Sequence, residues 1–295
     1  MTLPSSGTIK FTDIEGEFGQ TSPRSLSKYY GIDTGIPSSG QIKFSDFYGK
    51  VINATRTIGS NQNFNAASDF TNASIVGGLK SASTVSASGQ AVKYYITVNG
   101  TISASDTSTT AFDTGSFPAG SSVYLTNNSY IVGAGGRGGD RSGGSGSPGG
   151  NALILRLPTF ITNNGTIGGG GGGGGAGGDR QTTSCQQDGC CHQTCYTATG
   201  RGGGGGGGAG SVAGSGGNGG GTGSSGSLLT GGSGGGGTRE SNGSATEVGT
   251  NGAGGGNLGE NGGSSDGGGG AKGNYIVNNN YATWVVSGTL LGGVG

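Results

Sequence analysis

Long runs of glycine interrupt the second half of this chain and restrict its fold more than any other feature. Glycine accounts for 77 of the 295 residues, and the longest run, at 168–175, contains nothing else. Because glycine has no side chain to bury, a glycine strand becomes ordered only if neighbouring strands satisfy its backbone N–H and C=O groups. A polyproline-II-like strand has no internal hydrogen bonds, and glycine lets other strands approach it from every side. The runs therefore predict a sandwich of extended strands held mostly by backbone hydrogen bonds.

Disorder is the alternative that the same composition allows. Disordered chains usually remain soluble through net charge and proline, whereas this chain has 15 basic residues, 15 acidic residues and only 6 prolines. Apolar segments also follow the glycine tracts, at 151–167 and 275–291, and such segments need a packed surface. Both observations favour an ordered sandwich.

The balanced charge argues against several classes of function. Formal net charge is zero, so no basic surface indicates nucleic acid as a partner. We expect no secretory signal, and no apolar span of about 18 residues indicates a membrane helix. Segments such as GAGGRGG resemble phosphate-binding loops, but no Gly-Lys-Ser/Thr occurs, so we expect no cofactor.

The first fifty residues contain a repeat. LPSSGTIKFTDI at 3–14 recurs as IPSSGQIKFSDF at 36–47, and SLSKYYG at 25–31 resembles FSDFYGK at 44–50. Pro-Ser-Ser-Gly favours a turn, and the Ser/Thr-Asp that follows can begin a short helix. Three such units bury little surface alone, so residues 1–52 are predicted to form an arm that docks on something larger.

The next region has the pattern of β-strands. Apolar and polar residues alternate at 91–104 and 121–133, and turn residues such as Asn99-Gly100 separate these segments. We therefore expect a mostly β and irregular fold in three parts. These parts are the docking arm at 1–52, a small antiparallel β domain at 53–131, and a glycine-rich polyproline/polyglycine-II sandwich with tip loops at 132–295.

A second repeat links the β region to the glycine tracts. The segments 126–141 and 162–180 each begin with Thr-Asn-Asn and end with Gly-Gly-Asp-Arg after a glycine run. A flexible linker has no reason to repeat these boundaries. The repeat therefore favours glycine strands of defined length, each closed by a polar turn.

Several segments resemble those of tailed-bacteriophage tail proteins. The PSSGxIKFSDFYGK arm resembles an amino-terminal motif of such proteins, and segments 117–139 and 281–294 resemble glycine-rich tail proteins. The glycine stack with loops is similar to the polyglycine-II sandwich of tail-fibre adhesins in T-even-type phages. Together these similarities cover most of the chain.

The resemblance implies a virion tail protein, found outside the cell after host lysis, that binds a host receptor through loops at the tip of the sandwich. Its expected partners are other tail or baseplate proteins, through residues 1–52, and a host receptor that is an outer-membrane protein or a glycan. A homotrimer is one assembly that it allows. The family shares no motif in its tip loops, so it assigns no individual residue.

All four cysteines and the only histidine lie between 185 and 195, in the longest interruption of the glycine region. Zinc is a weak alternative, with ligands Cys185, Cys190, His192 and Cys195. Structural zinc sites usually have a second cysteine pair well downstream of the first, and the adjacent Cys190 and Cys191 are awkward for one tetrahedral metal. Two disulfides are preferred for a virion protein, since a polar loop gains most from cross-links. Because a bridge between adjacent Cys190 and Cys191 would be strained, we expect each to pair with one of the outer cysteines. Free thiols remain the third possibility.

Polar residues in the interruptions are the candidates for recognition, since loops on a rigid scaffold commonly carry function. The candidates are Gln186, Gln187, Asp188, His192, Tyr196, Arg239 and Glu240.

A purely structural tail component, such as a cap or spacer, is the main alternative function. An enzyme is not expected, because the acids are scattered and the one histidine lies within the cysteine loop. Ice binding would need a strict glycine triplet, which is absent.

Overall fold

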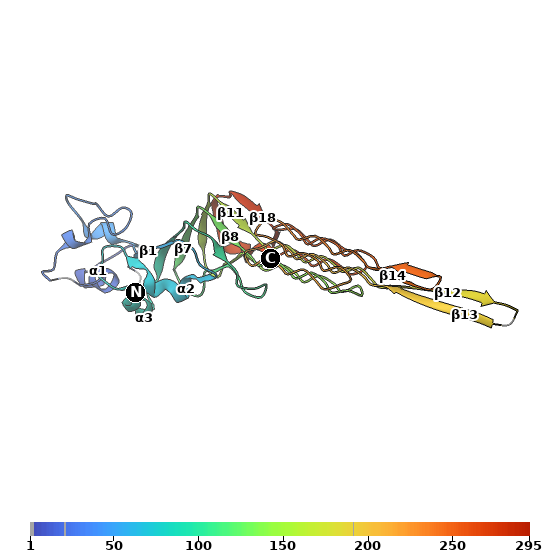
Figure 1. Ribbon diagram of the computed structural model, residues 1–295. Coiled ribbons are helices and arrows are strands. Elements are labelled where there is room, and N and C mark those ends of the chain that lie inside the picture. The colour runs from blue at the N-terminus through green and yellow to red at the C-terminus, as the bar shows by residue number, and fades with distance from the viewer. Residues whose placement is uncertain (1–2, 21, 191) are drawn as a thin grey trace.

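The computed structural model describes residues 3–20, 22–190 and 192–295 and shows an elongated molecule (Figure 1). The amino-terminal arm lies at one end, a body of short β-strands follows, and a long glycine block extends from the body to two hairpins at the other end. Within the described residues, no helix is both long enough and apolar enough to cross a membrane.

The arm is a ring of three similar units. Its helices are α1 (Phe11–Phe18), η1 (Leu26–Tyr29) and η2 (Phe44–Phe47). At equivalent positions of the three units, Ile14, Tyr29 and Phe47 meet in the centre, and each is fully buried. The internal repeat of the sequence therefore builds one small aromatic core.

Equivalent hydrogen bonds close this ring. Gly31 N donates to Pro37 O at 3.0 Å, and Gly49 N donates to Pro4 O at 2.9 Å. The hydroxyls of Tyr30 and Tyr48 donate to carbonyls in the same turns. The first unit has Glu15 at this position, and an ion pair to Arg24 at 3.0 Å joins it to the second unit.

Polar contacts, some of them buried, fix the arm on the body. Lys80 Nζ donates to the carbonyls of Gly16 and Glu17 and to Gln90 Oε1, at 2.6–2.8 Å. Glu17 is buried, which raises the pKa of its carboxyl, and it accepts hydrogen bonds from Ile52 N and Gln90. The arm is thus an integral cap on one end of the body.

The body is a parallel β-helix with three sheets. The first sheet contains β3 (Ser74–Ile75), β1 (Ile52–Ile58), β4 (Val92–Val98), β7 (Ser122–Asn127), β10 (Thr159–Asn163) and β17 (Ala282–Val286). The second contains β5 (Ile102–Ser103), β8 (Tyr130–Val132), β11 (Thr166–Gly168) and β18 (Thr289–Leu291). The third contains β2 (Phe64–Asn65), β6 (Phe112–Asp113), β9 (Leu153–Ile154), β16 (Asn274–Val277) and β19 (Gly293–Val294). Short helices lie between strands: α2 (Ala66–Asp69), η3 (Phe70–Asn72), α3 (Ala82–Ser88) and η4 (Asn279–Tyr281).

Successive coils of the chain visit the three sheets in turn and stack in parallel, as in β4–β5–β6 and then β7–β8–β9. The mostly β fold is confirmed, but the expected antiparallel pairing is wrong; in the first sheet only β3 runs antiparallel. A β-helix coil buries one face of each strand, so β4 alternates between buried and half-buried residues as an antiparallel strand would. Alternation alone therefore could not reveal strand direction.

The repeated Thr-Asn-Asn forms two asparagine ladders at one corner of the β-helix. Inside, the fully buried Asn127 donates from Nδ2 to Asn163 Oδ1 at 2.8 Å. Asn163 Nδ2 in turn donates to the carbonyls of Ser287 and Thr289 in the last coil. Outside, Asn164 donates to Asn128 at 2.9 Å. The repeat thus marks where successive coils turn.

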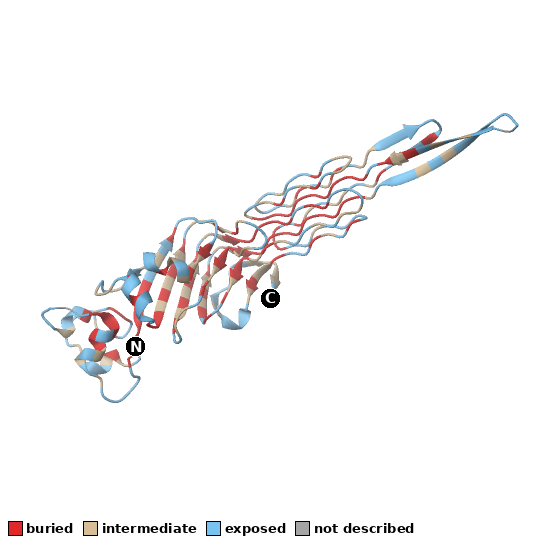
Figure 2. Ribbon diagram, turned by 90° about the horizontal axis from the view of Figure 1, so that it is seen from below, coloured by how far each residue is buried: buried red, intermediate tan, exposed pale blue. Residues whose placement is uncertain are grey.

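The glycine block is built from two insertions into consecutive coils, at 133–150 after β8 and at 169–273 after β11. Its strands pack side by side, and the inner ones are buried (Figure 2). In the central strand, 169–177, successive N–H groups point to three different neighbours and return to the same one every third residue. The N–H groups of Gly170, Gly173 and Ala176 donate to the carbonyls of residues 150, 147 and 144. Those of Gly171, Gly174 and Gly177 donate to the carbonyls of residues 209, 206 and 203. Those of Gly172 and Gly175 donate to the carbonyls of residues 260 and 263. This is the backbone lattice that the glycine runs predict.

Candidate functional site

Two antiparallel hairpins extend from the far end of the glycine block (Figure 1). The longer one consists of β12 (Arg180–Asp188) and β13 (His192–Gly200), and the shorter one of β14 (Arg239–Asn242) and β15 (Ala245–Val248). Most of their residues are exposed. They are the part of the molecule most distant from the arm.

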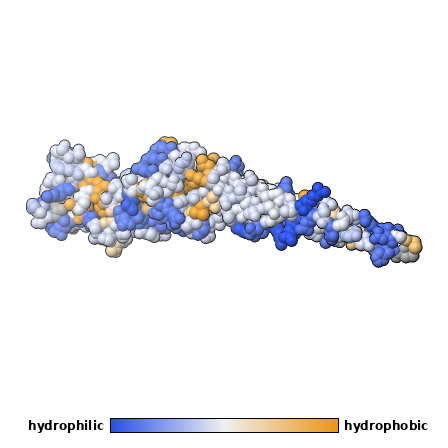
Figure 3. Space-filling view, viewed as in Figure 1, coloured by the Kyte–Doolittle hydropathy of each residue, from blue (hydrophilic) through white to orange (hydrophobic). Residues whose placement is uncertain are grey.

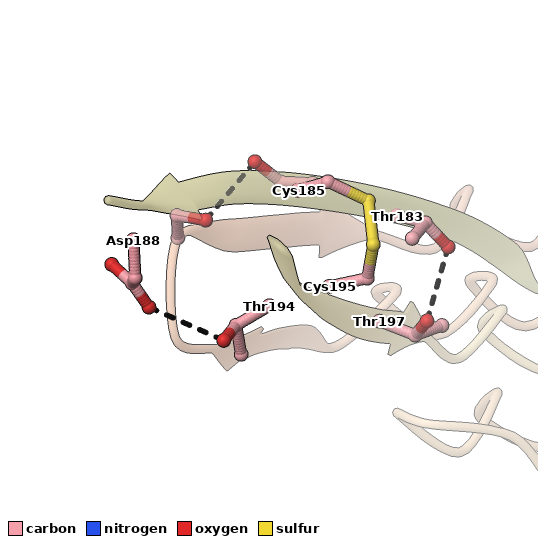
Figure 4. The surroundings of a disulfide bond; sticks show 8 residues. Thr183, Cys185, Asp188, Thr194, Cys195 and Thr197 are labelled. Carbon is pink, nitrogen blue, oxygen red and sulfur yellow. Dashed lines mark hydrogen bonds between the residues drawn. A yellow bond between two sulfur atoms is a disulfide. The ribbon is translucent and has the colours of Figure 1, made fainter. Parts of the chain in front are cut away.

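A disulfide joins Cys185 and Cys195 across the longer hairpin (Figure 4). The two residues are directly opposite in the strand register, with Cα atoms 3.9 Å apart. The expectation that each would pair with Cys190 or Cys191 is therefore wrong. The hairpin brings the outer cysteines together, whereas Cys190 follows the end of β12 and is exposed. One of the two expected bridges includes Cys191, which lies outside the described residues.

The disulfide also removes the basis of the alternative zinc site. Two of its four ligands, Cys185 and Cys195, are bonded to each other and so offer no thiolate to a metal. Among the described residues, no group of three or more His, Cys, Asp and Glu side chains has the geometry to hold a metal ion.

The shorter hairpin packs its turn on one face of the longer one. Ser244 Oγ donates to Ser184 Oγ at 3.0 Å, and Asn242 Nδ2 donates to Thr197 O at 3.1 Å. A Cβ on Gly243 would lie 2.3 Å from ring atoms of Tyr196, so the glycine backbone lies against that ring. Tyr196, a recognition candidate, thus contributes to the contact between hairpins.

The register of the longer hairpin divides the other candidates. Gln186, Asp188 and His192 share the face on which the shorter hairpin packs, and all three are exposed beyond its turn. Asp188 lies four residues past Ser184, which is about 14 Å further along the strand. Gln187 is on the opposite face, with the disulfide.

Arg239 and Glu240 lie on β14, away from the end of the longer hairpin. Glu240 is 3.7 Å from Arg201, an exposed pair that contributes little stability. The candidates therefore form two groups rather than one cluster.

Thr194 belongs with the distal group but was not predicted. It faces Gln186 across the hairpin and donates to Asp188 Oδ2 at 3.2 Å (Figure 4). Strand alternation would have placed it there. Thr194 is next to Cys195 and therefore points away from the disulfide, and it shares its face with His192, two residues away.

Three aspartates close the glycine strands where the block meets the hairpins, and hydrophilic side chains gather there on the surface (Figure 3). Asp140, Asp179 and Asp266 each accept a backbone N–H at 2.8 Å, from Asn218, Gly202 and Gly178. Two of them are the aspartates of the repeated Gly-Gly-Asp-Arg. They satisfy amides that have no further strand to pair with.

Hydrogen bonds lower the pKa of all three carboxyls. The pKa of Asp140 is lowered first by Arg137 and then by Asn218 N. The pKa of Asp179 is lowered mainly by Gly202 N. The pKa of Asp266 is lowered first by Thr250 and then by Gly178 N. A carboxyl whose pKa is lower in the folded protein stabilises it above the unfolded pKa, and this contribution disappears as pH falls through the folded pKa.

We expect acid to weaken the distal end of the block. The melting temperature of the wild type should fall as pH is lowered below about 4, and D140N/D179N/D266N should melt lower at neutral pH and show a smaller acid-induced fall. Thermal melts over a pH series measure both. Asp188→Asn is the control, because Asp188 lies beyond the block. A triple variant with the pH profile of the wild type would show that these carboxylates do not close the strands.

The family model described as "Phage tail fibre adhesin Gp38" matches residues 53–295. The chain belongs to this family. The adhesin also shares its fold with a chain of the solved structure titled "Crystal structure of the gp37-gp38 adhesin tip complex of the bacteriophage S16 long tail fiber". The TM-score is 0.53, and the 21% identity extends over 99% of this chain and 100% of that chain. No curated protein matches the sequence.

Family membership identifies the adhesin as a tail-fibre protein of the phage virion. The resemblance to glycine-rich tail-fibre adhesins is therefore confirmed. An adhesin is a binding protein, so its function lies in a surface that contacts a partner.

Proposed function

We propose that the adhesin binds a host cell-surface receptor through its two hairpins and acts without catalysis. The observation that carries this proposal is the distal face at the end opposite the arm, which consists of the exposed Gln186, Asp188 and His192 and the half-buried Thr194. The disulfide adjoins this face and the shorter hairpin supports its base, which reduces the conformational entropy lost on binding.

The polar character of the face suits a polar receptor surface, either an outer-membrane protein loop or a glycan. Carboxylate, imidazole, amide and hydroxyl groups lie together there and supply both donors and acceptors. Tyr196, Arg239 and Glu240 lie nearer the block and are proposed to support or border this face. The adhesin would meet the receptor outside the cell, after release by host lysis.

Removing the distal side chains should abolish most binding to host cells. We expect Q186A/D188A/H192A to bind at least about tenfold more weakly than the wild type, since a few central contacts usually dominate affinity. Fluorescently labelled full-length adhesin and host cells provide the measurement. Gln181→Ala is the matched control, because Gln181 is an exposed glutamine near the base of the same hairpin.

Equal binding by the triple variant, with an unchanged melting temperature, would contradict the proposal. The hairpins would then only extend the block, and the cap or spacer function would be favoured.

Residues 1–52 are proposed to attach the adhesin to another tail-fibre protein. The solved complex that the adhesin resembles pairs gp37 with gp38, and a ring of three similar units offers three equivalent corners to a symmetric partner. Phe44, 39% exposed, lies on this ring.

Phe44→Asp should reduce co-purification of the adhesin with fibre proteins from disrupted virions by about tenfold, because it places a charge in an apolar contact. Binding of the isolated variant to host cells should be unchanged. Undiminished co-purification would place the attachment surface elsewhere.

A further inference from the structure

A polar groove lies on the β-helix, apart from the hairpins. It consists of two adjoining hollows with volumes of about 290 and 360 Å³, which share Asn63, Phe64 and Asn65. The first extends over the outer face of β6 and β9, and the second extends along α2 and η3. The glycine block separates this part of the molecule from the hairpins (Figure 1), so the groove is not part of the candidate receptor face.

Amide and hydroxyl side chains dominate the lining. Asn61, Asn63 and Asn72 line the second hollow, and Ser108 and Thr110, from the loop before β6, line the first together with Asn63. Apolar lining is confined to Phe64, which is only 3% exposed, and Ile154. The groove thus offers many hydrogen-bonding groups together with some apolar surface, and no large apolar side chain of its lining is strongly exposed.

Its charged groups are already paired. Arg156 binds both oxygens of Asp113, at 2.8 Å each, in the first hollow. In the second, Asp69 accepts from Nε and Nη2 of Arg56 at 2.7 and 3.3 Å. Each pair is bidentate, which fixes the two planar groups and leaves no net charge.

We propose that this groove binds a short neutral saccharide of the host cell surface. A protein partner usually anchors on large exposed apolar or aromatic side chains, of which this lining has none, and a charged ligand would find each charge already neutralised. Each hydroxyl of a sugar ring can both donate and accept a hydrogen bond. The asparagine amides and the fixed carboxylate–guanidinium pairs of the groove offer both donors and acceptors in return. This second contact is independent of the hairpins, and two sites on one molecule would raise its overall avidity for a cell.

Saturation-transfer difference NMR on the full-length adhesin tests the proposal. The probes are glucose, galactose, N-acetylglucosamine and rhamnose, with N-acetylneuraminic acid as a charged comparison. We expect transfer to at least one neutral sugar and none to the acid. Asn63→Trp, which fills the junction of the hollows, should weaken that signal about tenfold, equivalent to the loss of one or two hydrogen bonds.

Two control variants locate the binding. Asn280→Trp changes an exposed asparagine outside the groove and should leave the signal intact. Q186A/D188A/H192A should also leave it intact. The proposal is overturned if none of the neutral sugars receives transfer, if Asn63→Trp binds as the wild type does, or if only the hairpin variant loses the signal. If no sugar binds to the wild type and Asn63→Trp no longer co-purifies with fibre proteins, the groove is a protein interface instead.

Discussion

Replacing Gly173 with alanine is expected to unfold much of the glycine block. A Cβ at this position would lie 1.9 Å from the Arg137 carbonyl oxygen and 2.4 Å from its carbon, both of them backbone atoms. The central strand would have to move by more than an ångström, which breaks the bonds from Gly173 N to Ser147 O and from Gly270 N to Gly173 O. Because the freed groups are buried, we expect a loss of at least about 4 kcal/mol in unfolding free energy.

Amide hydrogen exchange measures this effect directly. Protection should disappear in residues 169–177 and in the neighbouring strand 203–209. Gly236→Ala is the matched control, because the nearest atom to its Cβ would be 3.9 Å away. If both variants retain full protection, the close lattice described for the block is wrong.

Replacing Asn163 with leucine should destabilise the β-helix by about 2–4 kcal/mol. The substitution removes the partner of Gly165 N and leaves the Ser287 carbonyl without its donor. It also removes the shortest hydrogen bond of Asn127 Nδ2, which keeps only its 3.3 Å bonds to Ser129 O and Thr166 O. Each buried polar group that loses its partner costs about 1–3 kcal/mol. The last coil should loosen first, since the Asn163 side chain joins it to the coil before it, in addition to the β10–β17 and β11–β18 pairings.

Trp284, the single tryptophan, lies on β17 in that last coil, so its fluorescence during urea unfolding reports the effect. Asn164→Leu is the control in the adjacent, exposed ladder, and it should change stability by less than about 1 kcal/mol. Equal destabilisation by the two variants would show that burial of the inner ladder has no special importance.

The sequence predicted the glycine lattice because glycine leaves a chain few other ways to become ordered. It also identified the arm repeat and the Thr-Asn-Asn repeat. It did not show that Asn127 and Asn163 stack, because an insertion at 133–150 separates their coils and hides the stacking period.

Long-range pairing was the part that the sequence could not supply. The segments 151–167 and 275–291 were recognised as apolar, but nothing local indicates that Asn163 bonds to a residue 124 positions away. The cysteine pairing was missed for a related reason. Spacing alone does not reveal a hairpin register, and that register places Cys185 opposite Cys195.

The route of the chain through the glycine block determines how the molecule carries mechanical load. The two strands of the longer hairpin continue into neighbouring block strands, 169–178 and 201–210, which are joined by lateral hydrogen bonds along their length. A force that pulls on the tip while the arm is held acts along these strands and therefore perpendicular to the bonds. The bonds are then loaded in shear and together, rather than opened one after another, so a tether made mostly of glycine can resist the pull between a virion and a moving cell.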